Sequence, residues 1–385
     1  MITSYEIFVP MLMGSGASLR TGLKVRQLLG CKKILLVYDA GLKNVGIADV
    51  IEDNLKNAGI EIVIFDKVLP DPPDYLVEEG AELARKENVD GIVAVGGGSS
   101  IDTAKGINVL INNEPPIMKY FGIQKNLKFG VPMVFIPTTS GTGSEVTNMC
   151  VISCVSRGNK DSVVGPVCMA SLAIIDPDLT MGLPKKMTAA TGIDALAHAV
   201  EAITGSQANP LSDALARDAI RTISKWLPVA YNDGSNEEAR EKMILASTFA
   251  GMAFTNALVH LGHTIGHALG AHFHIPHGIG CAIALPEVIE YAAKTEWKKV
   301  EMICECMGAE IKEDATPEEI GIVAKNALRS FIKSVDIPNL EELGIQLEDA
   351  LQVAPLVTQD TGFALIPYRI TAARVAEMLK SAYDA

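Results

Sequence analysis

The sequence has little positive charge and no cluster of basic residues. Of its 385 residues, 33 are Lys or Arg and 46 are Asp or Glu, which gives a formal charge of −13 and a pI near 5.1. Such an acidic surface repels both phosphate backbones and anionic lipid headgroups. We therefore expect no nucleic-acid partner and no membrane-surface partner.

Long apolar runs and regularly spaced cysteines are also absent. Although 48% of the residues are hydrophobic, no stretch of about 18 apolar residues occurs, so no membrane-spanning helix is expected. The opening MITSYEIFVPML has no basic segment, and Glu6 interrupts it, which does not fit a signal peptide. The seven cysteines are odd in number and form no CxxC pair, which favours reduced thiols and a cytoplasmic location.

The hydrophobic pattern changes near Pro184. Before it, strand-like and helical segments alternate, which is typical of a parallel sheet covered on both faces. The expected strands are 32–39, 60–66, 89–96, 131–139, 145–155 and 172–176, and the expected helices are 45–59, 74–88 and 101–112. After Pro184 apolar residues recur at steps of three and four, which predicts helices only. We expect an α/β domain over 1–184 and an all-helical domain over 185–385, because the length exceeds that of one core.

Histidine is scarce outside one short stretch. Six of the seven histidines lie between His260 and His277. Upstream, Asp194 and His198 are one helical turn apart in an apolar segment, so their side chains share a face. His263 and His267 are also four residues apart and are expected on a second helix. One carboxylate and three imidazoles, drawn from the first helix, from His263 and from the loop at His277, suit Zn²⁺ or Fe²⁺. A hydrogen-bonded pair on a helix surface, together with a chance histidine cluster, would give the same pattern without a metal.

Two glycine-rich loops follow buried strands in the first half. In AVGGGSSIDTAK (94–105), consecutive glycines precede a helix, so backbone N–H groups can bind a diphosphate at its N-terminus. Ser99 or Ser100 is expected to cap this helix, with Asp102 completing a capping box. A tight strand-to-helix turn is the alternative, and GGGS is not the usual GxGxxG fingerprint. The second loop, PTTSGTGSEVT (137–147), is rich in hydroxyls and lies where α/β sheets bind ligands.

Asp39 follows another strand-like segment. A carboxylate there can accept hydrogen bonds from both ribose hydroxyls and would repel a 2′-phosphate, which favours NAD over NADP. A helix or turn cap is the alternative role. Because Asp39 precedes the glycine loop, the nucleotide site is not of the standard arrangement.

Taken together, six regions of the sequence resemble the iron-containing (group III) alcohol dehydrogenase family. They are GGGSSIDTAK (96–105), IPTTSGTGSEVT (136–147), IIDPDLT (174–180), AATGIDALAHAVEA (189–202), AGMAFTNA (250–257), and HTIGHALG with IPHG (263–270, 275–278). The resemblance implies a nucleotide-binding α/β domain, a helical metal-binding domain and an active site in the cleft between them. It also implies hydride transfer between NAD and a small alcohol or aldehyde, with Fe²⁺, or else Zn²⁺ or Mn²⁺, as the metal. A homodimer or larger homo-oligomer is expected, since family members are commonly dimers or larger.

The resemblance also assigns roles to particular residues. The implied metal ligands are Asp194, His198, His263 and His277, and His267 is implied to be a proton relay near the nicotinamide. The implied cofactor residues are Gly97, Gly98 and Ser99 at the diphosphate, Thr138, Thr139 and Thr142 near the nicotinamide half, Asp39 at the ribose, and Lys160 and Leu179 facing the nucleotide. His260, His272 and His274 match no ligand position and are interpreted as supporting or surface residues.

The C-terminal segment departs from the family pattern and leaves the substrate open. In ALIPYRIT (364–371), Ile366 stands where many members have asparagine. Met149, Phe254 and Phe363 are expected to line the substrate pocket. Two other functions remain open. A polyol dehydrogenase or lyase, similar to glycerol dehydrogenase or dehydroquinate synthase, is disfavoured for a highly anionic substrate because 189–204 and 250–280 contain no Lys or Arg. A non-catalytic metal-binding protein would leave the glycine loops without a purpose.

Overall fold

The computed structural model describes residue 5 and residues 9–385, and its contacts divide the chain into two compact units. Among these residues, the α/β unit comprises 9–139 and 143–182, and the helical unit comprises 183–385 with Ser140–Thr142 and Tyr5. The three loop residues join the helices because Gly141 lies against α6 (Lys185–Thr204): a Cβ on Gly141 would lie 2.8 Å from Thr191 Cβ.

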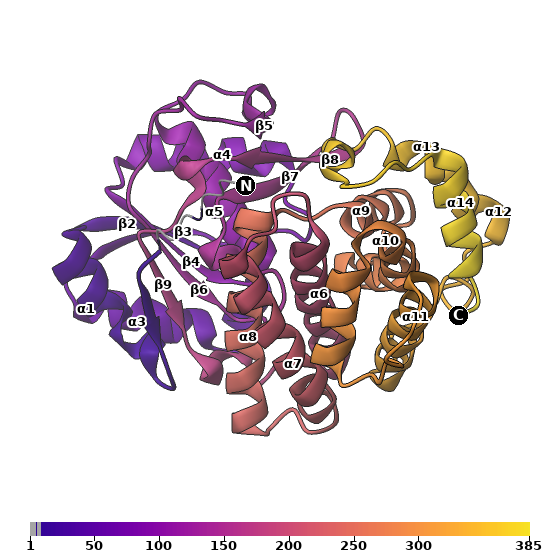
Figure 1. Ribbon diagram of the computed structural model, residues 1–385. Helices are drawn as coiled ribbons and strands as arrows, with labels where there is room; N and C mark the ends of the chain where they lie inside the picture. Colours follow the sequence, from indigo (N-terminus) through magenta and orange to yellow (C-terminus); the bar gives the residue numbers. More distant parts are fainter. Residues whose placement is uncertain (1–4, 6–8) are drawn as a thin grey trace. The chain divides into compact units, whose positions relative to one another are not determined.

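A six-stranded parallel sheet forms the centre of the α/β unit (Figure 1). Its strands are β1 (Met11–Met13), β9 (Leu172–Ile175), β6 (Met133–Pro137), β4 (Gly91–Gly96), β2 (Lys33–Val37) and β3 (Glu61–Phe65), in that spatial order. All five pairings are parallel, as the alternating pattern predicted. The main helices of the unit are α3 (Ile47–Asn57), α4 (Asp74–Glu87) and α5 (Gly98–Ile111).

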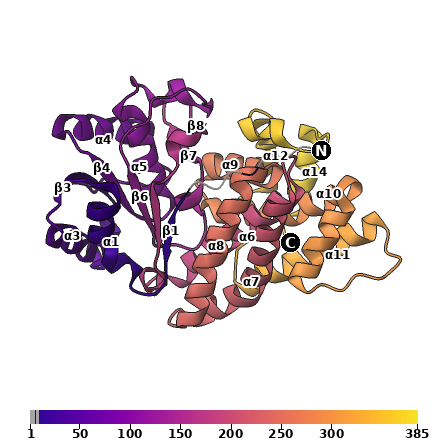
Figure 2. The ribbon, with the colours of Figure 1, turned by 60° about the vertical axis from the view of Figure 1, so that its left-hand side comes forward.

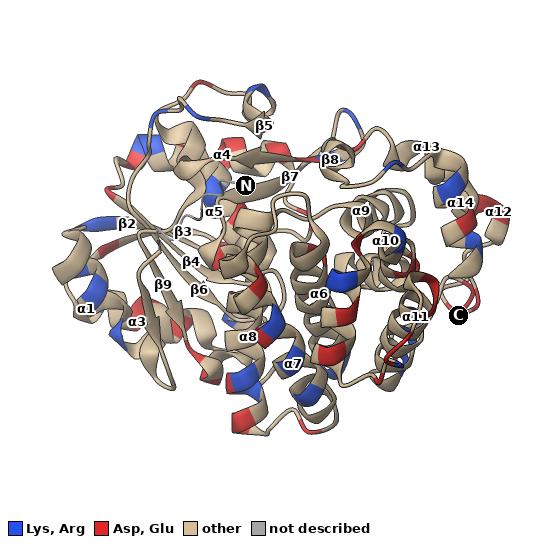
Figure 3. Ribbon diagram, viewed as in Figure 1, with Lys and Arg blue, Asp and Glu red and all other residues tan. Residues whose placement is uncertain are grey.

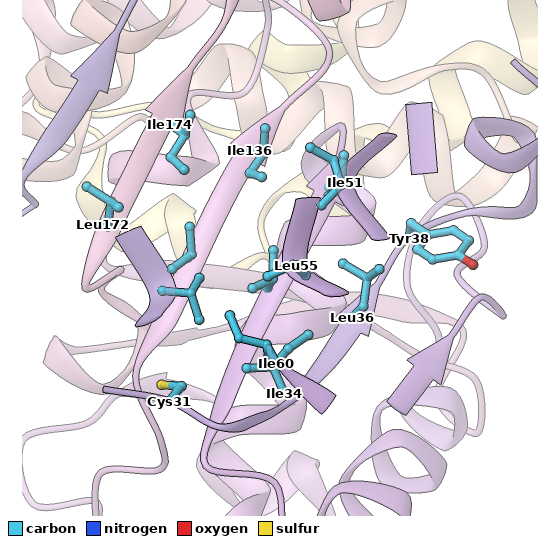
Figure 4. Packing of buried hydrophobic residues seen from close by; sticks show 14 of the residues in the cluster. Cys31, Ile34, Leu36, Tyr38, Ile51, Leu55, Ile60, Ile136, Leu172 and Ile174 are labelled. Atoms are coloured by element: carbon cyan, nitrogen blue, oxygen red, sulfur yellow. The ribbon is translucent and has the colours of Figure 1, made fainter. Parts of the chain in front are cut away.

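The core on one face of this sheet is built from alternate strand residues. Ile34 and Leu36 of β2 lie in one buried cluster with Ile51 and Leu55 of α3 (Figure 4). Side chains two apart on a strand share a face, and those three or four apart on a helix share a stripe. The apolar spacing in the sequence therefore fixes which face of β2 meets α3.

A second, three-stranded sheet was only partly predicted. It contains β5 (Gly122–Ile123), β8 (Asn159–Val164) and β7 (Met149–Cys154), with β7 and β8 antiparallel. The strand expected at 145–155 is β7. Strand β8 was not predicted, because NKDSVV is largely polar and lacks a clear apolar alternation.

The helical unit is built mainly from six helices, as the pattern after Pro184 predicted. They are α6, α7 (Pro210–Asn232), α8 (Glu237–Ala257), α9 (Leu261–Phe273), α10 (His277–Met307) and α11 (Pro317–Ser334). Figures 1 and 2 show α6, α7 and α8 side by side. Three shorter helices follow: α12 (Leu347–Gln352), α13 (Ala354–Val357) and α14 (Ala372–Ser381). No strand occurs in the described part of this unit.

Glycines bring α6, α9 and the start of α10 unusually close together. A Cβ on Gly278 would lie 2.0 Å from the Ala190 carbonyl oxygen of α6, and a Cβ on Gly280 would lie 3.0 Å from the Gly266 carbonyl oxygen of α9. Larger residues would force these helices apart. The close approach sets the side chains of the three helices around one point.

The charged residues are unevenly spread over the helices. Figure 3 shows charges of both signs on α7 and α8, whereas α9 carries no Lys, Arg, Asp or Glu. Within the described residues, no single helix has the length and apolar composition needed to cross a membrane. Only α8 and α9 taken as a pair meet that test, and they are bent by 107° at their junction.

Candidate functional site

The helical unit brings three of the four expected metal ligands to one point. Donor atoms of Asp194, His263, His277 and Cys281 all lie within 4.8 Å of one another. His277 Nε2 is 3.5 Å from Asp194 Oδ1. Asp194 comes from α6, His263 from α9, and the other two from the first turns of α10. Carboxylate, imidazole and thiol donors at this spacing can hold one divalent cation.

The fourth expected ligand, His198, lies beside this group rather than in it. It is one turn after Asp194 on α6, and its Nδ1 is 3.9 Å from Asp194 Oδ2. Its ring lies between two neighbours: the His263 ring, with centroids 4.5 Å apart, and the Phe254 ring, stacked at 4.2 Å. The structure therefore places His198 next to the other donors, and its role as a ligand stays a prediction.

Several polar atoms at this point are buried without a partner. Asp194 Oδ1, His198 Nδ1 and His263 Nε2 have no hydrogen-bond partner. Burial raises the pKa of Asp194 to about 7, lowers that of His263 to about 3, and holds the pKa of His198 well below its usual value. Buried polar groups normally have partners, because leaving them unpaired costs free energy. A cation fits this donor set, since it would supply the missing partner for all three atoms.

Glu201 holds His263 in one orientation. The two carboxylate oxygens accept hydrogen bonds from the backbone N–H groups of Gly262 (2.6 Å) and His263 (3.1 Å), and one also contacts His263 Nδ1. The buried His260 places its Nδ1 3.2 Å from the same carboxylate. With Nδ1 engaged by a carboxylate, Nε2 of His263 is the nitrogen left for a metal. Glu201 was not predicted as a site residue, although it lies seven residues after Asp194 and so on the same face of α6.

His267 is held by a residue from the C-terminal region. Its Nδ1 is 3.0 Å from Asp360 Oδ2, and its ring stacks on that of His277 with centroids 5.3 Å apart. Asp360 also accepts a 2.7 Å hydrogen bond from the Gly362 N–H. The side chains of His267 and His277 are 24% and 29% exposed, so solvent reaches this edge of the group. No sequence signal pointed to Asp360, because 93 residues separate it from His267.

The other two histidines of the cluster, His272 and His274, are exposed. They take no part in this group, in line with their interpretation as surface residues.

The two glycine-rich loops lie against each other in the α/β unit. Gly97 is the residue before α5, and a Cβ on it would lie 3.2 Å from the side chain of Thr139. The Thr138 N–H donates a 3.0 Å hydrogen bond to the Gly96 carbonyl. Gly98 and Ser99 form the first turn of α5, where N–H groups lack partners within the helix. The arrangement can bind an anion at this helix terminus.

Three further cofactor residues of the sequence analysis have partners within the protein. Asp39 Oδ1 accepts a 2.9 Å hydrogen bond from the Gly41 N–H and caps a short helix, which is the alternative role considered for it. Lys160 Nζ lies 2.6 Å from Asp71 Oδ1. Leu179 packs against the buried cluster of the sheet. Their contacts with a nucleotide stay predictions, as does that of Thr142.

The cap predicted for α5 is wrong. No side chain caps this helix, whose first residues are glycine and serine. Asp102 turns away from the helix start and accepts hydrogen bonds from Ser144 Oγ (2.6 Å) and the Val151 N–H (3.0 Å). A partly buried carboxylate needs such partners more than the helix needs a cap.

Lys105, one turn after Asp102, is fully buried. Its Nζ donates to the carbonyl oxygens of Ser144 (2.7 Å), Thr147 (3.0 Å) and Met149 (2.7 Å). Met149 therefore takes part through its backbone, and its role in lining a substrate pocket stays a prediction. Asp102 and Lys105, near the end of the GGGSSIDTAK motif, therefore fasten α5 to the second glycine loop.

Comparison with known proteins accounts for both units. Residues 10–177 match the family described as iron-containing alcohol dehydrogenase, and residues 188–383 match the C-terminal domain of the same family. The chain is 36% identical to the NAD-dependent methanol dehydrogenase of Bacillus methanolicus, over 99% of this chain and 100% of that protein. It is 39% identical to the 1,3-propanediol dehydrogenase of Citrobacter freundii, over 93% of each.

Solved structures agree. A crystal structure of a 1,3-propanediol oxidoreductase superposes with a TM-score of 0.94 at 37% identity, covering all of both chains. An alcohol dehydrogenase from Oenococcus oeni gives the same TM-score at 31% identity, over 99% of this chain and 100% of that one. The chain therefore belongs to the iron-containing alcohol dehydrogenase family and is an enzyme of the alcohol dehydrogenase class.

Proposed function

We propose that this enzyme uses NAD and a divalent metal ion, Fe²⁺ first and Zn²⁺ or Mn²⁺ as alternatives, to interconvert a small primary alcohol and its aldehyde. The observation that carries the metal is the set of three buried donor atoms without partners on Asp194, His198 and His263. We assign these three residues and His277 as the ligands. A bound divalent ion supplies Lewis-acid polarisation of the substrate oxygen, lowering the pKa of the alcohol.

The surrounding residues prepare the ligands and handle the proton. Glu201 fixes the ring of His263, so that its Nε2 is the donor nitrogen. His267 exchanges the alcohol proton through Nε2, because its Nδ1 is held by Asp360. Phe254, stacked on His198, places an apolar ring beside the proposed ligands.

The glycine loops carry the NAD assignment. N–H groups of Gly97, Gly98 and Ser99 bind the diphosphate, while Thr138, Thr139 and Thr142 contact the nicotinamide half. Asp39 can accept from a ribose hydroxyl while it caps its helix, because a carboxylate accepts several hydrogen bonds.

The substrate class follows from charge and from the relatives. No Lys or Arg occurs within 189–204 or 250–280, so the ligand-bearing segments offer no lysine or arginine side chain to hold a phosphate or carboxylate. Relatives of similar length act on methanol and 1,3-propanediol, both small uncharged primary alcohols. We infer that the substrate is of that kind.

The test is a substrate screen on metal-free protein reloaded separately with Fe²⁺, Zn²⁺ and Mn²⁺, with metal content measured in each sample. NADH oxidation by short aldehydes is expected only in reloaded samples. His267→Ala should lower turnover while leaving metal content near that of the parent. Turnover in fully metal-free protein, or loss of metal from the His267 variant, would refute the assignment.

We also propose a homo-oligomer and a reducing, cytoplasmic setting. All seven cysteines are buried thiols and none is in a disulfide, which agrees with a reducing compartment. Light scattering on the purified chain measures the oligomer size directly.

A further inference from the structure

Cys281 is the one member of the four-residue donor group that neither the motifs nor the proposed mechanism uses. Its Sγ lies 3.7 Å from His277 Nε2, one turn earlier on α10. It is fully buried, and a Cβ on Gly266 would lie 2.8 Å from this sulfur. The thiol therefore occupies a slot that exists only because residue 266 of α9 is glycine, between His263 and His267.

The distances within the group match those of a metal site. Two ligands on one tetrahedral zinc ion stand roughly 3.3–3.8 Å apart, given bond lengths of about 2.0–2.3 Å. The observed separations are 3.5 Å for His277 Nε2 to Asp194 Oδ1 and 3.7 Å for Cys281 Sγ to His277 Nε2. Two of the other donors, Asp194 Oδ1 and His263 Nε2, are buried without hydrogen-bond partners. The Cys281 sulfur thus lies among donor atoms that lack hydrogen-bond partners and that a cation would satisfy.

We propose that Cys281 is an alternative metal ligand that gives the site a second coordination set for thiophilic ions. In this set Asp194, His263 and His277 bind together with Cys281, and His198 stays stacked on Phe254. In the other set, His198 takes the fourth place. On binding, the S–H bond breaks, an S–metal bond forms, and the proton passes to solvent at the exposed edge beside His267. No atom is oxidised or reduced. The inference rests on the metal site proposed above and concerns only which side chains complete it.

The two sets differ in which ion they favour. Thiolate sulfur prefers Zn²⁺, whereas carboxylate and imidazole also suit Fe²⁺ and Mn²⁺. Cys281 should therefore raise the affinity for Zn²⁺ more than that for Mn²⁺. Both sets supply four protein ligands, so they differ in the fourth donor atom, sulfur or nitrogen, and not in the number of ligands.

The first experiment uses the unmodified full-length protein. Metal-free protein is loaded with Co²⁺, and with Zn²⁺ for X-ray absorption. A thiolate-to-cobalt charge-transfer band in the near ultraviolet, together with a sulfur scatterer at about 2.3 Å from zinc, is expected. Stoichiometric binding with nitrogen and oxygen scatterers only would overturn the role of Cys281 and leave the metal site standing. Absence of any stoichiometric binding would overturn both proposals.

The second experiment compares Cys281→Ala with Cys304→Ala, which removes another fully buried thiol from the same helix. Loss of the cobalt band and a drop in Zn²⁺ affinity of about tenfold or more are expected for the first variant alone. Mn²⁺ affinity should change little in either. An equal fall in Zn²⁺ and Mn²⁺ affinity for Cys281→Ala, or a retained cobalt band, would contradict the proposal.

Discussion

Each unit of this enzyme buries a polar cluster, and the two clusters are satisfied to different degrees. In the α/β unit, Asp102 has two hydrogen-bond donors, and the Lys105 ammonium donates to three carbonyl oxygens. In the helical unit, Asp194 and His263 keep donor atoms that meet no partner. Burial removes both clusters from water, which costs free energy. Only in the first cluster do hydrogen bonds within the protein offset that cost.

The difference separates a structural cluster from a binding site. A buried charge that is fully hydrogen-bonded fixes its surroundings, as Lys105 fixes the second glycine loop. Burial raises the pKa of the Asp194 carboxylate to about 7, and a cation bound there would favour its charged form. This contrast yields four predictions, ordered by the size of the expected effect.

Asp194→Asn should have the largest effect, because it removes the anionic member of the ligand group while keeping its shape. We expect metal affinity to collapse and turnover to fall by about 1000-fold, since polarisation of the substrate by the ion contributes several kcal/mol. The matched control is Asp213→Asn, since Asp213 Oδ1 also lacks a hydrogen-bond partner but lies in α7, which contributes no residue to the four-residue donor group. Metal analysis and NADH oxidation measure both. Full metal content in the Asp194 variant would remove the basis of the comparison.

Lys105→Met should destabilise the fold rather than the chemistry. The substitution leaves the partly buried Asp102 carboxylate without its cationic neighbour, and it leaves three carbonyl oxygens without a donor. Breaking such a cluster costs about 3–5 kcal/mol of unfolding free energy. Lys67→Met, which removes an exposed lysine paired with Glu79, should cost far less, because water screens an exposed ion pair. Denaturant unfolding decides the matter, and equal values for the two variants would show that the α/β cluster is not structural.

These two clusters also show what could be predicted from the sequence. Five strands of the parallel sheet and its three main helices followed from apolar spacing, whereas β1 did not. The pairing of Asp194 with His198 followed from a four-residue step. Lys105 was part of a recognised motif, yet its burial was not foreseen, because periodicity does not reveal which polar residue on a helix turns inward. For the same reason Asp102 was wrongly predicted to cap α5, whereas its side chain turns toward Ser144 and Val151.

Contacts between segments far apart in the chain could not be predicted from the sequence. Asp360 meets His267 only through the path of the C-terminal region, and β8 is too polar to show a strand pattern. Glu201 and Cys281 lie seven and four residues from recognised ligands, so helical spacing could have found them.

The third prediction concerns the pH dependence of the metal-free protein. Burial raises the pKa of Asp194 from 3.8 to about 7, so between these values the folded chain holds a proton that the unfolded chain has lost. Stability from this group is therefore present at low pH and is lost as the pH rises toward 7, by about 1.4 kcal/mol per unit. His263, whose pKa is lowered to about 3, acts in the opposite sense, since its stability is lost as the pH falls below 6.5.

Because the two groups oppose each other, the parent protein alone should show little pH dependence from this pair. The metal-free Asp194→Asn variant has no carboxyl group at position 194, so it does not lose the stability that the parent loses as the pH rises. Its unfolding free energy relative to the parent should therefore rise by roughly 2–3 kcal/mol between pH 5 and pH 7. Denaturant curves at several pH values measure the difference. A constant difference across this range would mean that the carboxylate is already stabilised without an ion.

The smallest expected effect tests the proton path at the edge of the site. Asp360→Asn keeps the shape of the side chain but replaces a charged acceptor of the His267 Nδ1–H by a neutral one. The ring then loses part of what fixes its tautomer, and turnover should fall by about tenfold while metal content is unchanged. The reference is His267→Ala, because the double variant should then be no slower than His267→Ala alone. Additive losses of turnover would show that Asp360 acts on the site by another route, such as the hydrogen bond that it accepts from the Gly362 N–H. Turnover would then depend on the metal ligands and not on a His267 ring that Asp360 holds in place.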